Sequence, residues 1–343
     1  RRTGRQPRSA RRLVVNTRTL CGRTVRPIGL GCMNLSWAYG DPPPHEDKVR
    51  LLNEALDLGY DHLDTANIYG KGANEELLGD AVMHRRDEFL LASKTGIIVD
   101  GPRRGIDCSP EAIGSSLDAS LKRLGTDHID LFYMHRFDPK VPVADSVGAM
   151  VRAIEAGKIG AYGVSEWSAA HIREAHAVHP MAAVQTEFSL WTRNVELGVL
   201  DATRELGIAL VAFSPVARGA LGGELKDPAT LGDKDLRRSH PRFDSANWPH
   251  NRALIDQFDD LAQENDLRPA QLALAWVLAQ GDHVHAIPGT TDIDHMADNF
   301  AASDKTVPAE VLDRAGQLIN QQSVRGHRYP EVMQSTIDTE DYA

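Results

Sequence analysis

The sequence has few cysteines, few aromatic residues and no long hydrophobic run. Its three cysteines, Cys21, Cys32 and Cys108, are widely spaced and form neither a CxxC pair nor a cluster with histidine, which argues against a disulfide framework or a zinc site. The longest apolar runs, such as residues 208–213, are far shorter than the roughly 20 residues of a membrane-spanning helix. We therefore expect a cytoplasmic protein with no bound metal and no membrane partner.

Charge is distributed unevenly along the chain. The net charge is −10, yet the first twelve residues contain six arginines and no acidic residue. The acidic remainder makes nucleic acid an unexpected partner. We expect residues 1–19 to be a basic, disordered extension, and the alternatives are an arginine-rich transit peptide or a nucleic-acid-binding arm.

Short strand-like runs alternate with longer helical patterns from about residue 26 onward. The composition, 42% hydrophobic and 25% charged, is sufficient for a large core. The alternation predicts parallel βα units, and eight strands are the number of a (β/α)8 TIM barrel. The predicted strands are residues 27–31, 62–64, 89–94, 129–135, 159–165, 183–187, 209–213 and 285–288.

The predicted domain organisation is one barrel over residues 20–322, followed by a C-terminal tail over residues 323–343. Residues 20–25 predict a β-hairpin that closes the bottom of the barrel, and extra helices are expected near the C-terminus. A doubly wound sheet is disfavoured because the turn at residues 29–34 lacks the third glycine of a phosphate-binding loop. Residues 217–250 are expected to form a lid or binding loop.

Four polar residues follow or end consecutive predicted strands. Asp64 ends the second strand, Tyr69 follows it, Lys94 ends the third and His135 ends the fourth. Strand ends converge in a parallel barrel, so these side chains should meet at one point. Lys94 would then depress the pKa of the Tyr69 phenol, Asp64 would keep Lys94 charged, and His135 would orient an oxygen atom, which is a proton-donating arrangement.

These residues lie within motifs that resemble the aldo-keto reductase superfamily, including bacterial-type members and members similar to potassium-channel β subunits. The resemblance extends from about residue 20 to residue 319. The matching segments are DHLDTANIYG (61–70), NEELLG (74–79), GVS (163–165), VQTE (184–187), FSP (213–215) and IPGTT (287–291).

The resemblance implies a barrel that transfers hydride between a nicotinamide dinucleotide and a carbonyl carbon, with Asp64, Tyr69, Lys94 and His135 as the catalytic tetrad. It implies that Phe213 stacks on the nicotinamide, that Ser165 and Gln185 hold its carboxamide, and that Arg218 contacts the pyrophosphate. The other implied cofactor-binding residues are Gly31, Cys32, Met33, Ser214, Pro215, Val216, Gly289, Thr290, Thr291, His295, Asp298 and Asn299.

Two residues depart from the family pattern. Asp292 occupies the place where relatives carry a basic residue, and a carboxylate about 4 Å from a 2′-phosphate would cost up to roughly 4 kcal/mol at an effective dielectric near 20. Alternatively, Asp292 caps the following helix and points away. Glu166 occupies the place of an asparagine. We expect NADP(H) as the cofactor, with NAD(H) not excluded.

The expected partner is a small carbonyl or alcohol substrate. Trp37, Tyr39 and Trp191 are predicted to line its pocket, whereas Phe243 and Trp248 either line it too or anchor their own loop. One rival function is a cofactor-binding regulatory subunit with little turnover, similar to the channel β subunits. A second rival is a metal-dependent hydrolase that uses His62, Asp64 and His135.

Overall fold

The computed structural model describes residues 16–100 and 103–342. Most of the predicted basic extension, residues 1–15, lies outside the described residues. Its last part is structured, because the first strand, β1 (Arg18–Leu20), begins before residue 20. The barrel domain therefore starts a few residues earlier than predicted.

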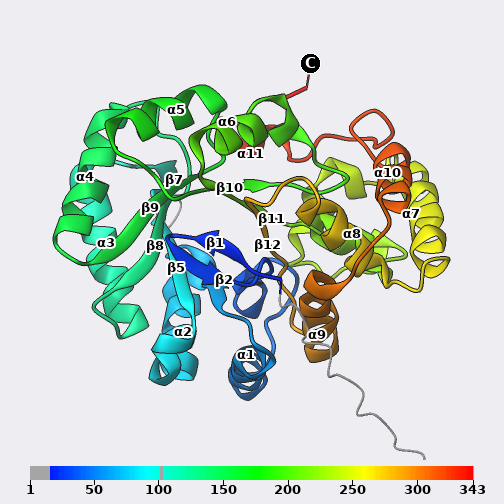
Figure 1. The fold of residues 1–343 in the computed structure, drawn as a ribbon, viewed down its shortest axis with the longest axis horizontal. Helices are drawn as coiled ribbons and strands as arrows, with labels where there is room; N and C mark the ends of the chain where they lie inside the picture. Colours follow the sequence, from blue (N-terminus) through cyan, green and yellow to red (C-terminus); the bar gives the residue numbers. More distant parts are fainter. Residues whose placement is uncertain (1–15, 101–102, 343) are drawn as a thin grey trace, which may run out of the picture.

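Eight parallel strands form the predicted TIM barrel (Figure 1). The first and last strands close it through a parallel bridge between Ile28 and Ala286, with the amide of Gly29 donating to the carbonyl of Ala286 at 2.9 Å. A Cβ atom on Gly31 would lie 2.7 Å from the carbonyl oxygen of Ile287, so this close approach requires glycine. The strands are β3 (Leu30–Gly31), β4 (His62–Asp64), β5 (Leu90–Thr95), β8 (Ile129–Met134), β9 (Ile159–Ser165), β10 (Ala183–Glu187), β11 (Ala209–Phe213) and β12 (Val284–Ile287).

Helices surround the barrel and bury their apolar faces against the strands (Figure 1). Local sequence signals set their ends: Ser109 caps helix α3 by accepting from the amide of Ala112, and Gly125 ends it with a φ of +66°. The helices are α1 (His45–Leu58), α2 (Ala73–Val82), α3 (Pro110–Leu124), α4 (Val143–Glu155), α5 (Ala169–Val178), α6 (Val199–Leu206), α7 (Trp248–Gln263), α8 (Pro269–Leu278), α9 (Ile293–Ala301), α10 (Ala309–Leu318) and α11 (Glu331–Gln334).

The predicted N-terminal hairpin pairs β1 with β2 (Arg23–Val25) and lies over the middle of the barrel in Figure 1. Leu20 and Val25 are both 1% exposed and belong to a core cluster with residues at the starts of the strands, such as Leu90 and Ala183. The hairpin therefore closes the end of the barrel at which the strands begin, as predicted. The opposite end, where the strands finish, stays available for a site.

A second hairpin was not predicted. Strands β6 (Ile97–Asp100) and β7 (Arg103–Ile106) pair antiparallel in the loop that follows β5. This loop lies at the finishing ends of the strands, so the hairpin adds a wall there. Within the described residues, no helix combines the length and apolar character needed to cross a membrane.

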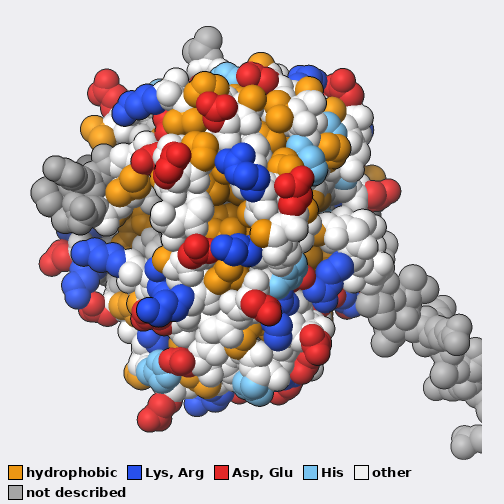
Figure 2. Space-filling view, turned by 90° about the vertical axis from the view of Figure 1, so that its left-hand side faces the viewer, with side chains coloured by type: hydrophobic (Ala, Val, Ile, Leu, Met, Phe, Trp, Pro, Cys, Tyr) orange, Lys and Arg blue, Asp and Glu red, His pale blue; other side chains and the backbone are white. Residues whose placement is uncertain are grey.

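The outer surface carries charges of both signs. Figure 2 shows acidic and basic side chains intermixed on the side of the molecule where α3, α4 and α5 lie in Figure 1. Exposed ion pairs include Lys158 with Asp118 at 2.6 Å and Arg173 with Glu205 at 2.7 Å. Exposed pairs contribute little to stability, so the fold depends on its core.

The core packing of the hairpin predicts a stability effect. Replacing Leu20 by Ala should lower the free energy of unfolding by about 2–5 kcal/mol, because it leaves a cavity in the closed end of the barrel. Urea unfolding followed by circular dichroism measures the loss. The matched control is Leu58→Ala in α1, a side chain that is 42% exposed, where a change within about 0.5 kcal/mol is expected. Equal losses at the two positions would contradict the closing role of the hairpin.

Candidate active site

The four residues of the predicted tetrad converge at the finishing ends of β4, β5 and β8. Lys94 is fully buried, and its Nζ donates to Asp64 Oδ1, to the carbonyl oxygen of Thr65 at 2.8 Å and to Tyr69 Oη at 3.4 Å. His135 completes the group, with its ring edge-on to that of Tyr69 at a centroid distance of 6.0 Å. The ammonium thus connects a carboxylate to a phenol.

Burial decides the protonation of Tyr69. Burial raises the pKa of its phenol, and the Lys94 ammonium opposes this shift without cancelling it. Lys94 lowers the phenol pKa, as predicted, but desolvation is the larger effect and the net shift is upward. For Lys94, burial has the opposite effect and lowers the pKa of the ammonium, but Asp64 and Tyr69 raise this pKa above its ordinary value. Tyr69 is therefore protonated and Lys94 charged at neutral pH.

His135 is neutral at neutral pH. Burial, together with the charges of Arg136 and Lys94, holds its pKa well below the ordinary value. Its Nδ1 has no hydrogen-bond partner among the described residues. A neutral imidazole keeps one N–H donor and one acceptor nitrogen, so it is able to orient an oxygen without adding charge.

A cavity of about 1340 Å³ opens above the tetrad and is lined by Asp64, Tyr69 and His135. Its walls include most of the residues that the family resemblance implies for the cofactor. These are Gly31, Met33, Gln185, Phe213, Ser214, Pro215, Val216, Arg218, Gly289, Thr290, Thr291, His295, Asp298 and Asn299.

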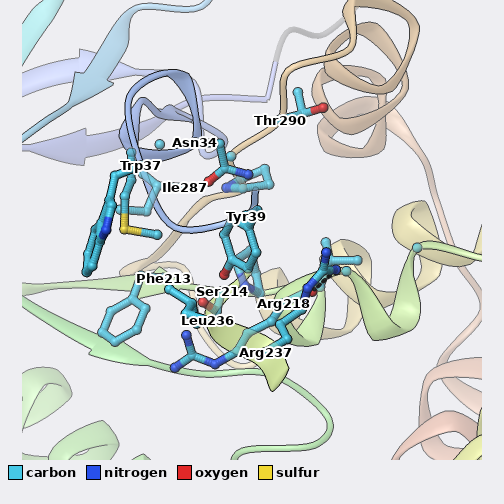
Figure 3. Close-up of a pocket in the computed structure, with 18 of the residues that line it drawn as sticks. Asn34, Trp37, Tyr39, Phe213, Ser214, Arg218, Leu236, Arg237, Ile287 and Thr290 are labelled. Carbon is cyan, nitrogen blue, oxygen red and sulfur yellow. Dashed lines mark hydrogen bonds between the residues drawn. The ribbon is translucent and has the colours of Figure 1, made fainter. Parts of the chain in front are cut away.

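Two loops face each other across this cavity (Figure 3). The loop after β3 contributes Asn34, Trp37 and Tyr39, and the opposite side is formed by Phe213 and the loop after β11. The loops touch where Tyr39 pairs with Asp235 in a β-bridge and the amide of Leu236 donates to the carbonyl of Ala38 at 2.9 Å. Arg237 lies 5.0 Å from the centre of the Tyr39 ring. The long loop over residues 217–250 therefore crosses the cavity, as expected for a binding loop.

Two side chains near the tetrad fit a carboxamide-bearing cofactor. Ser165, at the end of β9, is buried, and its Oγ has no partner among the described residues. Gln185, at the centre of β10, donates from Nε2 to Asp64 Oδ2 at 2.7 Å and reaches the cavity wall. A buried hydroxyl without a partner is costly unless a ligand satisfies it, so the Ser165 Oγ is available to a polar group such as a carboxamide.

Four predicted site residues do not line the cavity: Lys94, Cys32, Ser165 and Trp191. The side chain of Cys32 is fully buried and its Sγ contacts the carbonyl oxygen of Leu30 at 3.6 Å, because it points into the barrel wall. Trp191 is 2% exposed and packs against Phe243 at 5.6 Å, and Phe243 stacks in turn on Trp248. Trp191 therefore belongs to the cluster that anchors the long loop, and so do Phe243 and Trp248.

Asp292 caps helix α9, as one of the two sequence interpretations proposed. Its Oδ1 accepts from the amide of His295 at 2.9 Å, and the side chain is not part of the cavity wall. His295 pairs with Glu224 at 2.8 Å. Two cations that the sequence did not suggest line this end of the cavity instead: Arg268, which pairs with Asp298 at 3.0 Å, and Lys226.

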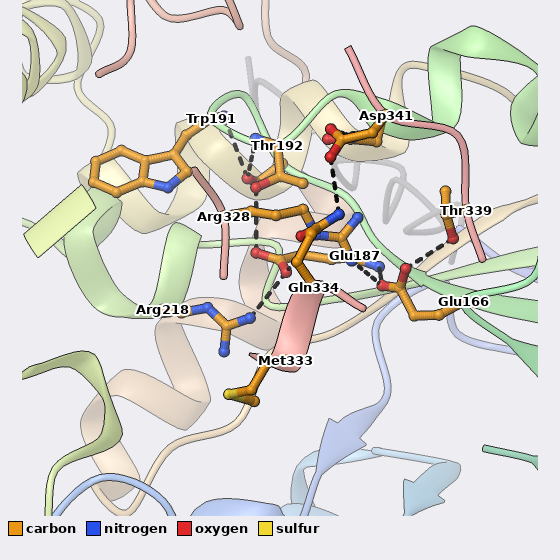
Figure 4. A network of polar contacts seen from close by, with 12 residues as sticks. Glu166, Glu187, Trp191, Thr192, Arg218, Arg328, Met333, Gln334, Thr339 and Asp341 are labelled. Carbon is orange, nitrogen blue, oxygen red and sulfur yellow. Dashed lines mark hydrogen bonds and ion pairs between the residues drawn. The ribbon is translucent and has the colours of Figure 1, made fainter. Parts of the chain in front are cut away.

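A buried ionic network lies beside the cavity (Figure 4). Arg218 Nη2 contacts Glu187 Oε2 at 2.9 Å, and Thr192 donates to the other carboxylate oxygen at 3.2 Å. Burial alone would raise the pKa of Glu187, but Arg218, Arg328 and Arg242 lower it to about 2. Glu187 therefore stays ionised and holds Arg218 at the cavity wall.

The same network holds the C-terminal segment, residues 325–342, against the barrel. Arg328 forms a buried ion pair with Glu166, which also accepts from Thr339 Oγ1 at 2.8 Å (Figure 4). Tyr329 lies between two guanidinium groups, 4.9 Å from Arg218 and 5.0 Å from Arg328. Residues 323–343, predicted to be a tail, are thus structured through residue 342. Five of them line the cavity and were missed: Tyr329, Val332, Met333, Ser335 and Thr336.

The arrangement of His62 does not favour a metal site. Its ring is fully buried inside the barrel, and burial lowers its pKa to about 3. A Cβ on Gly29 would fall 2.6 Å from the ring, which shows how closely the first strand covers it. In residues 16–100 and 103–342, no three potential ligands among histidine, cysteine, aspartate and glutamate are grouped to hold a metal ion.

Comparisons with known proteins show the family of this chain. The model of the "Aldo/keto reductase family" matches residues 27–320. The chain is 40% identical over 310 residues to "Probable aldo-keto reductase 1" of Glycine max, covering 90% of this chain and 89% of that protein. It is also 40% identical over 324 residues to the NADP(+) aldo-keto reductase yakc of Schizosaccharomyces pombe. That match covers 92% of this chain and 95% of the relative.

A glycerol dehydrogenase of Gluconobacter oxydans has a similar structure, with a TM-score of 0.81 and 27% sequence identity. The similarity covers 89% of this chain and 95% of that one. The chain therefore belongs to the aldo/keto reductase family.

The pair between Glu166 and Arg328 predicts how the C-terminal segment is held. Glu166→Gln removes the carboxylate and leaves the Arg328 charge buried without a partner. This should lower the free energy of unfolding by about 3–5 kcal/mol and release the C-terminal segment from the barrel. Limited trypsin digestion followed by mass spectrometry should then show rapid cleavage after Arg325 or Arg328. The matched control is Glu205→Gln, in an exposed pair with Arg173, where wild-type cleavage is expected. Unchanged cleavage in Glu166→Gln would mean that other contacts hold the segment.

Proposed function

We propose that this protein is an NADP(H)-dependent oxidoreductase that reduces an aldehyde or ketone to the alcohol, or catalyses the reverse reaction, with Tyr69 as the general acid or base. The observation that carries the proposal is the buried Lys94 ammonium, which contacts both Asp64 and the Tyr69 hydroxyl at the base of the cavity. Membership of the aldo/keto reductase family supports the reaction class.

In the proposed reaction, the bound cofactor supplies a hydride to the carbonyl carbon. Tyr69 donates its phenolic proton to the carbonyl oxygen, which develops negative charge as the hydride arrives. Lys94 stabilises the phenolate left on Tyr69, and Asp64 keeps Lys94 charged through their buried contact. His135, neutral and adjacent to Tyr69, directs a ring N–H toward the same oxygen.

Preference for NADP(H) is supported by the name of the Schizosaccharomyces pombe relative and by the cations at one end of the cavity. A 2′-phosphate requires positive charge, and Arg268 lies on the cavity wall with its side chain 69% exposed. Asp292 is engaged in capping α9, so its carboxylate does not oppose a phosphate there. We propose that Arg268, together with Thr290 and Thr291, holds this phosphate.

Replacing Tyr69 by Phe tests the proton donor. We expect carbonyl reduction to fall at least about a hundredfold, because the variant lacks the acidic proton, while NADPH binding stays unchanged. Steady-state kinetics with a panel of aldehydes and ketones, and fluorescence titration with NADPH, measure the two quantities. The control is Tyr342→Phe, at a tyrosine that does not line the cavity and whose hydroxyl donates to the carbonyl of Arg193. Full activity of Tyr69→Phe would exclude Tyr69 as the donor.

Wild-type turnover tests the rival regulatory function. Tight NADPH binding without turnover of any carbonyl compound in the panel would favour a regulatory subunit over an enzyme.

Replacing Arg268 by Ala tests the proposed phosphate contact. The ratio of kcat/KM with NADPH to that with NADH should fall at least tenfold, about 1.4 kcal/mol, because only NADPH carries the 2′-phosphate. The matched control is Arg314→Ala, a similarly exposed arginine in a surface pair with Glu264, which should leave the ratio unchanged. A constant ratio in Arg268→Ala would place the phosphate elsewhere.

A further inference from the structure

Arg136 is a cationic residue of the cavity wall that the proposed mechanism does not use. It directly follows His135, lines the cavity and is partly exposed. Its Nη1 donates to the carbonyl oxygen of His135 at 2.6 Å, which folds the side chain back over the end of β8. Among the described residues, no carboxylate forms an ion pair with this guanidinium.

Each of the other cations that line the cavity pairs with a carboxylate. Arg218 pairs with Glu187 at 2.9 Å, and Arg237 makes a two-pronged contact with Asp235, the shorter distance being 2.6 Å. Arg268 and Lys226 pair with Asp298 at 3.0 Å and with Asp259 at 3.4 Å. Among the described residues, Arg136 therefore differs from these four in having no carboxylate partner.

Arg136 acts close to the reacting groups. Arg136 lines the same cavity as Tyr69 and His135, and its charge lowers the pKa of both groups. Other parts of the cavity wall are apolar: Ile97, Val99 and Ile106 come from the β6–β7 hairpin, and Trp37, Met333 and Val332 are exposed hydrophobic residues. A guanidinium that lacks a carboxylate partner in the described chain and lies beside apolar walls is suited to a planar anion, which it binds with two parallel hydrogen bonds.

We propose that Arg136 binds a carboxylate group of the substrate, so that the enzyme prefers oxo acids to neutral carbonyl compounds. The carbonyl oxygen lies at Tyr69, the carboxylate at Arg136, and the remaining carbon atoms contact the apolar wall. Reduction then yields a hydroxy acid. This specificity rests on the proposed reductase function and names its substrate class.

The test compares each acid with its own methyl ester, which keeps the carbonyl group and removes only the negative charge. Glyoxylate, 4-oxobutanoate and 4-formylbenzoate, each with its ester, are supplied to the full-length protein with NADPH. We expect wild-type kcat/KM to favour at least one acid over its ester. Arg136→Gln should lower kcat/KM for that acid at least tenfold, mainly through KM, and change that of the ester less than threefold.

Matched variants separate recognition from structural damage. Arg136→Lys should restore part of the preference for the acid, because it keeps the charge but not the two parallel donors. Arg237→Gln alters another cavity arginine that already has a carboxylate partner, and it should leave the ratio of acid to ester unchanged. Weaker NADPH binding in Arg136→Gln would overturn the proposal, because Arg136 would then serve the cofactor.

Binding of benzoate gives a readout that does not depend on turnover. In a fluorescence titration of the protein with NADP⁺ present, Arg136→Gln should weaken benzoate binding at least tenfold. Equal binding in the variant and the wild type, or equal losses for acid and ester, would overturn the proposal. Absence of turnover with every substrate would count against the reductase function, and the benzoate titration would still decide the role of Arg136.

Discussion

The Lys94 ammonium has no exposure to water, and the arrangement of the site follows from this burial. An unpaired charge in a protein interior costs several kcal/mol, so Lys94 requires the Asp64 carboxylate from the neighbouring strand. The strand register supplies it, because Asp64 pairs with Ala92, two residues before Lys94 on the same face of β5. Tyr69 then receives a fixed cationic neighbour, while its own burial keeps the phenol protonated.

A second group of buried charges connects the barrel to the rest of the cavity wall. Glu166 and Glu187 lie at the ends of adjacent strands, and each accepts an arginine from a segment distant in sequence. Arg218 belongs to the loop after β11, whereas Arg328 belongs to the C-terminal segment. Glu166, which departs from the family pattern, therefore has a structural partner in this chain. Two carboxylates thus position both the loop expected to contact the cofactor and the segment that narrows the cavity.

Local signals predicted the barrel well. The strands Ile159–Ser165 and Ala209–Phe213 match the sequence prediction residue by residue, because glycine and polar residues bound their apolar runs. The β6–β7 hairpin was missed, since its residues 97–106 show no alternation long enough to distinguish a strand from a loop. Trp191 was wrongly predicted to line the substrate pocket, because the sequence does not show whether a tryptophan near a site faces the pocket or the core. Its packing against Phe243, which stacks on Trp248, places it in the core.

The sequence by itself determined the barrel and the four polar residues that meet at its finishing end, because periodicity, caps and strand-end positions are local properties. The family motifs indicated most of the residues around the cavity. Only the tertiary structure decided the protonation of Tyr69, the outward position of Asp292, the docking of residues 325–342 and the lack of a carboxylate partner for Arg136 among the described residues. These properties depend on burial and on distances between segments far apart in the chain, and no local pattern encodes either.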